Sequence, residues 1–298
     1  MKRVQSLLFG GFIAFVALAA FNSCSEIPPY IDFSRPIIIY RADTTYVTTN
    51  LPTGVQRNIL IEDISGVKCN NCPRAADIAH NIQADNDSGR VIVMTLHSWD
   101  FAELTAPYPE SKDTLNTDEA TRIVQNLHIG NVAGLPAGGI DRLVFEGETQ
   151  SLIPYWKWEA KANERLAVPA VADLTLTMEV KEDRVMTGTM RTTFLQDIET
   201  PILMSLFILE NDIKTKQKMP DNTYNKDYKH YSVLRKALTP ITGVKLADNA
   251  EIGRVYERVF EFEVPEKYVF ENCSVVALIS TVTADDNEVL QSAEAHID

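Results

Sequence analysis

The sequence predicts an α/β domain over residues 56–166, followed by an all-β antiparallel module over residues 167–298. In the first stretch, apolar runs of strand length alternate with amphipathic helical stripes, an order typical of a sheet with helices on its faces. After about residue 168 the hydrophobic period becomes two, which is the period of strands with one buried face. The module is therefore expected to be a β-sandwich.

The elements of the α/β domain are predicted from local signals. Pro73 favours the start of a helix because its missing N–H has no partner in a first helical turn. Asn116 with Glu119 offers an N-cap and its reciprocal partner for a second helix. The expected order is a strand at 58–64, a helix from 73 to about 82, a strand at 91–97, a helix from about 116 to 127, a strand at 139–145 and a helix over about 151–166.

The β module contains alternating strands and longer apolar strands. We expect these strands at about 174–180, 202–209, 260–264 and 274–283. Residues 214–236 between them are polar and locally basic, and we interpret them as a solvated loop with a short helix rather than a binding patch. Cys273 begins an apolar strand and is interpreted as a buried, inert thiol.

The first residues have the pattern of an export signal. Lys2 and Arg3 precede an apolar run that is too short to span a membrane, and small or neutral residues then lead to Cys24. We therefore predict a lipoprotein signal peptide over 1–23, with lipid on Cys24 as a membrane anchor. The alternative is an ordinary signal peptide with a coincidental cysteine. Residues 24–55 are rich in Pro and Thr and are interpreted as a tether, with one strand at about 37–40.

Charge and cysteine content exclude two classes of protein. The chain has 298 residues and a formal net charge of -13, so bulk charge does not favour binding to nucleic acid. Four cysteines, one of them assigned to lipid, do not make a disulfide scaffold. The hydrophobic core must therefore carry the stability of the fold.

Cys69 and Cys72 form a CxxC motif directly after a buried strand and at the start of a helix. Unpaired N–H groups and the helix dipole favour a thiolate at such a position. Cys69 is expected to attack a partner's disulfide, and Cys72 to resolve the mixed disulfide. The alternative is a small structural disulfide between the two residues.

Asp63 lies on the preceding strand, six positions before Cys69. A carboxyl group buried beneath the dithiol has a raised pKa and can relay a proton for Cys72. The alternative is that Asp63 forms only a local cap or pair.

Leu135-Pro136 precedes the third expected strand. A cis-proline there places its backbone beside the dithiol and leaves the N–H and C=O of Leu135 free to pair with an extended peptide. A zinc site needs four ligands, but only Cys69 and Cys72 have the required spacing, and His80 and His97 lie on separate elements. We therefore expect no metal and no cofactor.

Residues 56–166 resemble a thioredoxin-like domain, with strand, CxxC motif, helix and a later proline at the cis-proline site. The whole chain resembles the "outer membrane protein twenty-eight" lipoproteins of Bacteroidetes. The segments that carry this resemblance are 61–66, 69–73, 134–139, 230–238, 273–279 and 288–291. The resemblance implies a thioredoxin-like domain followed by an immunoglobulin-like β-sandwich, on a lipid-anchored protein of the outer membrane that faces either the periplasm or the outside.

The motif departs from ordinary thioredoxins. Lys68 stands where Trp is usual, Asn70-Asn71 where Gly-Pro is usual, and Leu135 where Thr, Ile or Val is usual. These differences leave the redox direction open. Two functions follow: thiol–disulfide exchange with a protein or peptide of the envelope or the exterior, or non-enzymatic adhesion and binding by a lipoprotein whose Cys69–Cys72 disulfide is structural.

Overall fold

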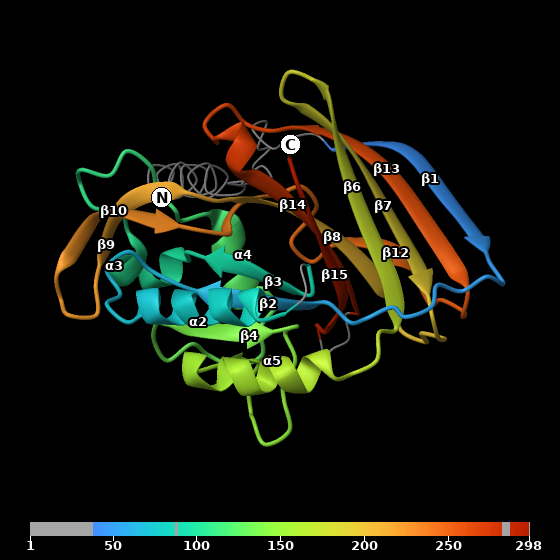
Figure 1. The fold of residues 1–298 in the computed structure, drawn as a ribbon, viewed down its shortest axis with the longest axis horizontal. Coiled ribbons are helices and arrows are strands. Elements are labelled where there is room, and N and C mark those ends of the chain that lie inside the picture. Colours follow the sequence, from blue (N-terminus) through green and yellow to red (C-terminus); the bar gives the residue numbers. More distant parts are fainter. Residues whose placement is uncertain (1–37, 87–88, 282–286, 298) are drawn as a thin grey trace, which may run out of the picture. The chain divides into compact units, whose positions relative to one another are not determined.

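The computed structural model describes residues 38–86, 89–281 and 287–297, and its chain is mostly β-sheet with few helices (Figure 1). The predicted signal peptide, Cys24 and the first part of the predicted tether lie outside these residues. The elements up to residue 166 are β1 (Ile39–Val47), β2 (Ile59–Ile64), α2 (Cys72–Ala84), β3 (Val91–Leu96), η1 (Trp99–Phe101), α3 (Ala102–Thr105), α4 (Asp118–Asn126), β4 (Ala137–Ile140), β5 (Leu152–Ile153), η2 (Tyr155–Lys157) and α5 (Trp158–Leu166).

The remaining elements are almost all strands. They are β6 (Ala172–Glu182), β7 (Val185–Phe194), β8 (Ile202–Glu210), β9 (Ile213–Lys218), β10 (Tyr224–His230), β11 (Val233–Ala237), β12 (Val244–Ala247), β13 (Arg254–Glu263), η3 (Phe270–Asn272), β14 (Cys273–Thr281) and β15 (Val289–His296). In the part of the chain described, no helix is both long and apolar enough to cross a membrane.

A nine-stranded sheet has the order β15-β14-β8-β11-β3-β2-β4-β5, with β12 paired to β8. Within it, β2 is parallel to β3 and antiparallel to β4. Side chains of β2 alternate between two cores: Ile59 and Ile61 pack with α2 and α5, whereas Leu60 and Ile64 pack with α4. Helices therefore cover both faces of this part of the sheet.

The other half of the nine-stranded sheet packs against a second sheet of order β1-β13-β7-β6. Phe260 and Met190 of the second sheet share one core with Leu206 and Val275 of the first. The predicted antiparallel β-strands thus form two packed layers. β11 joins the two halves, since it pairs parallel with β3 and antiparallel with β8.

Strand β1 differs from the tether expected there. It has nine residues and pairs antiparallel with β13 from Ile39 to Val47, so it extends well past the predicted strand at 37–40. Its side chains are exposed, which removes the apolar signal by which a strand is recognised in a sequence.

Three predicted boundaries in the α/β part were wrong. Thr117, not Asn116, caps α4, because its hydroxyl accepts a hydrogen bond from the backbone N–H of Ala120. β4 ends at Ile140 because the next two residues have positive φ and turn the chain. The predicted helix at 151–166 begins only at Trp158, since the short strand β5 and Pro154 precede it.

The predicted loop and short helix at 214–236 were also wrong. This segment forms a hairpin of β9 and β10, followed by β11. On β9, Thr215 and Gln217 point inward and the lysines point outward, so the period of two is carried by polar residues. A pattern of alternating apolar residues therefore cannot indicate strand β9.

Candidate functional site: the Cys69–Cys72 disulfide

Cys69 and Cys72 form a disulfide whose Cα atoms are 5.4 Å apart. Cys72 is the first residue of α2, and Pro73 follows it in the first turn, as the sequence predicted. Cys69 lies in the turn between β2 and α2, where its N–H donates to the carbonyl of Gly66 over 3.1 Å. The residues are 4% and 1% exposed, so the motif is closed to solvent in this conformation.

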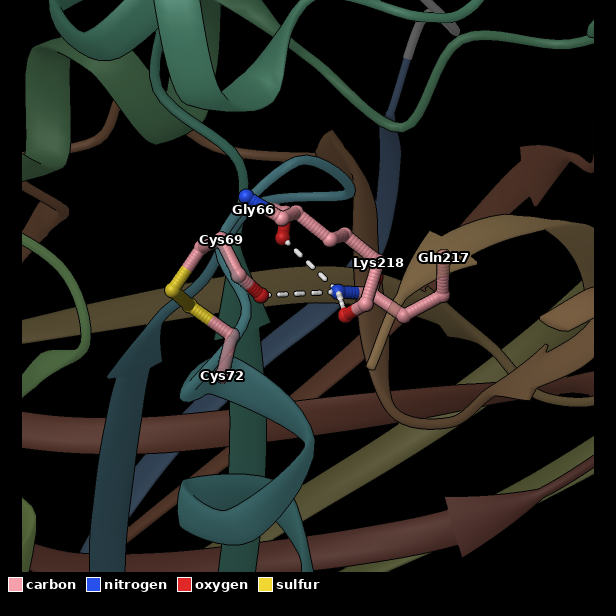
Figure 2. Close-up of a disulfide and its surroundings, with 5 residues drawn as sticks. All are labelled: Gly66, Cys69, Cys72, Gln217 and Lys218. Atoms are coloured by element: carbon pink, nitrogen blue, oxygen red, sulfur yellow. Dashed lines mark hydrogen bonds between the residues drawn. A yellow bond between two sulfur atoms is a disulfide. The ribbon is translucent and has the colours of Figure 1, made fainter. Parts of the chain in front are cut away.

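Gln217 of β9 fixes the backbone of the motif. Its Nε2 donates to the carbonyl oxygens of Cys69 (3.0 Å), Gly66 (3.2 Å) and Lys218 (3.0 Å). Figure 2 shows Gln217 on one side of the Cys69 backbone and the two sulfur atoms on the other. Gln217 is not predicted as a site residue from the sequence, because its only signal is that it alternates with lysines on a strand of polar residues.

The side chain of Asp63 is fully buried, and neither carboxyl oxygen has a hydrogen-bond partner among the residues that the structure describes. Because side chains alternate along β2, Asp63 lies on the same face as Ile59 and Ile61, beneath α2. Its neighbours in the sheet are Thr95 and Gly138. Burial raises the pKa of Asp63 to about 7. The carboxyl group therefore exchanges a proton near neutral pH, as a general acid or base requires.

Gly138 is required beside Asp63 by the packing of Trp158. A Cβ at position 138 would lie 2.4 Å from Cζ2 of the Trp158 ring and 2.6 Å from the carbonyl oxygen of Glu62. The indole N–H of Trp158 donates to the carbonyl of Ile153, which satisfies the polar atom of this buried ring. The Trp158 ring therefore packs against Gly138, next to Asp63, on the same face of the sheet.

Two histidines from distant segments lie close together just beyond the end of β3. His97 follows β3, and His230 ends β10; their ring centroids are 5.9 Å apart. Burial lowers the pKa of His230 to about 3 and lowers that of His97 well below its usual value. Both rings are therefore neutral at pH 7 and supply no positive charge to Asp63. The sequence pattern marks His97 only as a possible zinc ligand.

No group of three or more His, Cys, Asp or Glu side chains suited to a metal ion is present within 38–86, 89–281 and 287–297. Cys273 is buried, its thiol lies 3.3 Å from the carbonyl oxygen of Val269, and burial raises its pKa to about 12. This thiol is therefore protonated at neutral pH and buried away from solvent.

Pro136 follows Leu135 through a cis peptide bond. The next residue, Ala137, begins β4 and pairs with Ile64, the last residue of β2. Leu135-Pro136 therefore lies at the end of β2 from which the chain runs on to Cys69. Both residues are half-buried, and Leu135 packs against the core on the α4 side of the sheet.

Comparison with known proteins gives a matching family model and several matching solved structures. The family model described as outer membrane protein Omp28 matches residues 126–298. HBP35 of Porphyromonas gingivalis has a similar fold, with a TM-score of 0.62 and 18% identity over 82% of this chain and 76% of that chain. A domain of the outer membrane lipoprotein Omp28 from Porphyromonas gingivalis aligns with a TM-score of 0.30 and 18% identity, over 43% of this chain and 89% of that domain. No curated protein sequence matches the chain.

Proposed function

Because this chain belongs to the Omp28 family of outer membrane proteins, as its sequence predicted, we propose that it is a lipid-anchored protein that exchanges thiols and disulfides with partners in the cell envelope. Its anchor is the lipid on Cys24, after removal of the signal peptide 1–23. The exchanging group is the pair Cys69 and Cys72. The partner is a protein or peptide of the envelope or the exterior, and no cofactor takes part.

The topology supports a thioredoxin-like domain over residues 56–166. β3, β2, β4 and β5 are neighbours in this order, α2 and α5 pack on one face, and α4 packs on the other. The disulfide at the start of α2 and the cis bond before β4 lie where that fold has its reactive site. The two packed layers of antiparallel strands support an immunoglobulin-like sandwich over residues 167–298.

The observation that carries the proposal is the unpaired, fully buried carboxyl group of Asp63. A buried carboxyl group without a hydrogen bond costs the fold free energy, so its presence beneath a CxxC motif favours a chemical role. With a pKa of about 7, Asp63 can accept a proton near neutral pH. In the proposed exchange, the group that must lose a proton is the thiol of Cys72, at the start of the helix that packs over this face of the sheet.

The exchange has two steps. The thiolate of Cys69 attacks one sulfur of the partner's disulfide, and the other partner sulfur leaves as a thiolate. Asp63 then takes the proton of Cys72, and the Cys72 thiolate attacks the sulfur of Cys69, which releases the second partner sulfur. The partner is reduced to a dithiol, and Cys69–Cys72 is oxidised to the disulfide. The reverse sequence oxidises a partner dithiol.

Leu135 and Pro136 are the proposed contact for the partner's backbone. They lie at the end of β2 that leads to the motif, and an extended peptide placed there can pair with the N–H and C=O of Leu135. Such pairing recognises backbone rather than side chains. It therefore suits a protein with many partners.

The burial of both cysteines favours a second candidate function. At 4% and 1% exposure, Cys69 and Cys72 are closed to a protein disulfide in this conformation. A binding or adhesion lipoprotein with a structural disulfide needs no access to these sulfurs. Exchange, in contrast, requires the motif to open.

Trapping of a mixed disulfide separates the two functions. In Cys72→Ser, Cys69 should attack a peptide disulfide and remain bound to the peptide, because the resolving thiol is absent. In Cys69→Ser, the proposed attacking thiol is absent, so the adduct should be at least about tenfold weaker. Intact-protein mass spectrometry measures both adducts. No adduct in either variant would favour the binding lipoprotein, and equal adducts would contradict the assignment of Cys69 as the attacking thiol.

A further inference from the structure

The β9–β10 hairpin is basic in an acidic protein. Residues 213–230 contain five lysines and two aspartates, a formal charge of +3, whereas the whole chain has a net charge of -13. Lys216 pairs with Glu110 and Lys229 pairs with Asp212. Lys214, Lys218 and Lys226 form no ion pair with any other residue that the structure describes.

The lysines of β9 lie on one side of the hairpin. Burial alternates along β9, with Thr215 and Gln217 inward and Lys214, Lys216 and Lys218 outward. On β10, Lys229 pairs in register with Lys214. We call Lys214, Lys216, Lys218, Lys226, Lys229 and Tyr224 the basic face. Lys214 and Lys229 carry like charges in directly opposite positions, and their repulsion destabilises the hairpin. Stability of the fold therefore does not explain this arrangement.

Aromatic rings hold the central lysine in place. The Nζ of Lys216 lies 4.4 Å from the ring centroid of Tyr108 and 4.7 Å from that of Tyr224. The two rings meet edge to face, with centroids 6.0 Å apart. Lys68, which precedes Cys69, lies 5.5 Å from the Tyr108 centroid. The two rings and the ion pair with Glu110 therefore hold Lys216 in a fixed position on the hairpin.

The hairpin that carries the basic face touches the disulfide motif directly. The N–H of Lys218 donates to the carbonyl of Val67 over 2.9 Å, and Gln217 donates to the carbonyl of Cys69. Asn222, in the hairpin turn, lies 3.5 Å from Asn70 between the two cysteines. The basic face therefore belongs to a hairpin that is in direct contact with the backbone of the CxxC motif.

We propose that the basic face is a docking surface for an acidic segment of the partner protein, which it steers toward Cys69–Cys72. This proposal rests on the exchange function above and names the class of partner. Charge complementarity argues for it, because the hairpin is positive whereas the chain as a whole has a formal net charge of -13. Such steering weakens with salt, since charges more than about 10 Å apart are screened at about 0.1 M ionic strength.

Binding is tested first, without redox chemistry. The oxidised protein is titrated against two fluorescent peptides that lack cysteine, one rich in Glu and one rich in Lys, and anisotropy is recorded. The Glu-rich peptide should bind at least about tenfold more tightly at low salt. The triple variant K214E/K218E/K226E should lose this preference. The control K181E/K245E/K267E changes net charge equally at exposed lysines outside the hairpin and should keep it.

The rate of exchange is tested second. The reduced protein reacts with the same two sequences, each carrying one cysteine in a disulfide with 5-thio-2-nitrobenzoate, and the released coloured thiolate is measured. The acidic peptide should react about tenfold faster at low salt, and the difference should shrink as salt is added. Equal binding of the two peptides, or equal loss in the hairpin variant and the control, overturns the proposal.

The binding experiment and the rate experiment distinguish the docking surface from the exchange function. Preferential binding of the acidic peptide without any reaction supports the docking surface and contradicts exchange. Reaction with both peptides at one rate, without preferential binding, supports exchange and contradicts the docking surface. Vesicles with anionic lipid are titrated in parallel: if they bind through the same lysines and the acidic peptide does not, the face recognises a membrane surface, and the proposal is wrong.

Discussion

Asp63→Asn is expected to stabilise the oxidised protein at neutral and alkaline pH. The carboxyl group titrates near 3.8 in the unfolded chain, whereas burial raises its pKa to about 7 in the folded protein. Folding therefore takes up a proton between these pH values, and the wild-type protein loses stability as pH rises through this window. The amide does not titrate. The unfolding free energy of the variant relative to wild type should therefore grow by about 4 kcal/mol from about pH 4 to about pH 8.

The same substitution should slow exchange. The amide cannot accept the proton of Cys72, so the resolving step should be about 100-fold slower at pH 7, and the pH dependence centred near 7 should disappear. Urea unfolding at several pH values and stopped-flow resolution of the mixed disulfide measure the two effects. Asp77→Asn, an exposed carboxylate on α2, is the control. A stability gain without a change in the resolving rate would show that Asp63 is not the proton acceptor.

Arg142→Met is expected to cost the fold about 3–5 kcal/mol, because it leaves the carboxylate of Glu62 buried without its main partner. Nε and Nη2 of Arg142 donate to both carboxyl oxygens of Glu62 over 2.8–3.2 Å. Nε2 of His128 lies 3.1 Å from the same carboxylate. Burial alone raises the pKa of Glu62, but its interactions with Arg142 and His128 outweigh burial and hold it at about 2.

A double variant tests the physical reason for this loss. In Glu62→Gln with Arg142→Met, no charge of the pair remains buried, so most of the lost stability should return. Arg41→Met is the matched control: it breaks the pair with Glu261, but Arg41 is 49% exposed, and the expected loss is below about 1 kcal/mol. Denaturant unfolding of the four proteins measures these differences. A double variant as unstable as Arg142→Met would show that packing, not the unpaired carboxylate, explains the loss.

The parts of the site predicted from the sequence depend on short-range signals. Pro73 in the first turn of α2, the spacing of Cys69 and Cys72, and the buried run that contains Asp63 all lie within one strand–turn–helix unit. The proline before β4 was expected from its position before a strand, and its peptide bond is cis. Such features are fixed by local backbone geometry, which a sequence pattern can indicate.

The missed parts depend on contacts between distant segments. Gln217 is recognisable only through the carbonyl of Cys69, which lies 148 positions earlier in the chain. His97 and His230 are likewise brought together by the pairing of β11 with β3. The hairpin of β9 and β10 has lysines, threonine and glutamine where strands usually have apolar residues. Its fold follows from the surface on which it packs rather than from its own pattern.

The reduction potential of Cys69–Cys72 tests the central claim most directly. The part of the chain that follows Cys24 is equilibrated in glutathione buffers, and the free thiols are alkylated. The fraction of protein with Cys69 and Cys72 reduced is then measured by mass spectrometry. An exchanging pair should have a potential between about -270 and -120 mV, with Cys69 alkylated before Cys72. A potential below about -300 mV would contradict the claim, because the disulfide would then be a structural bond of a binding lipoprotein.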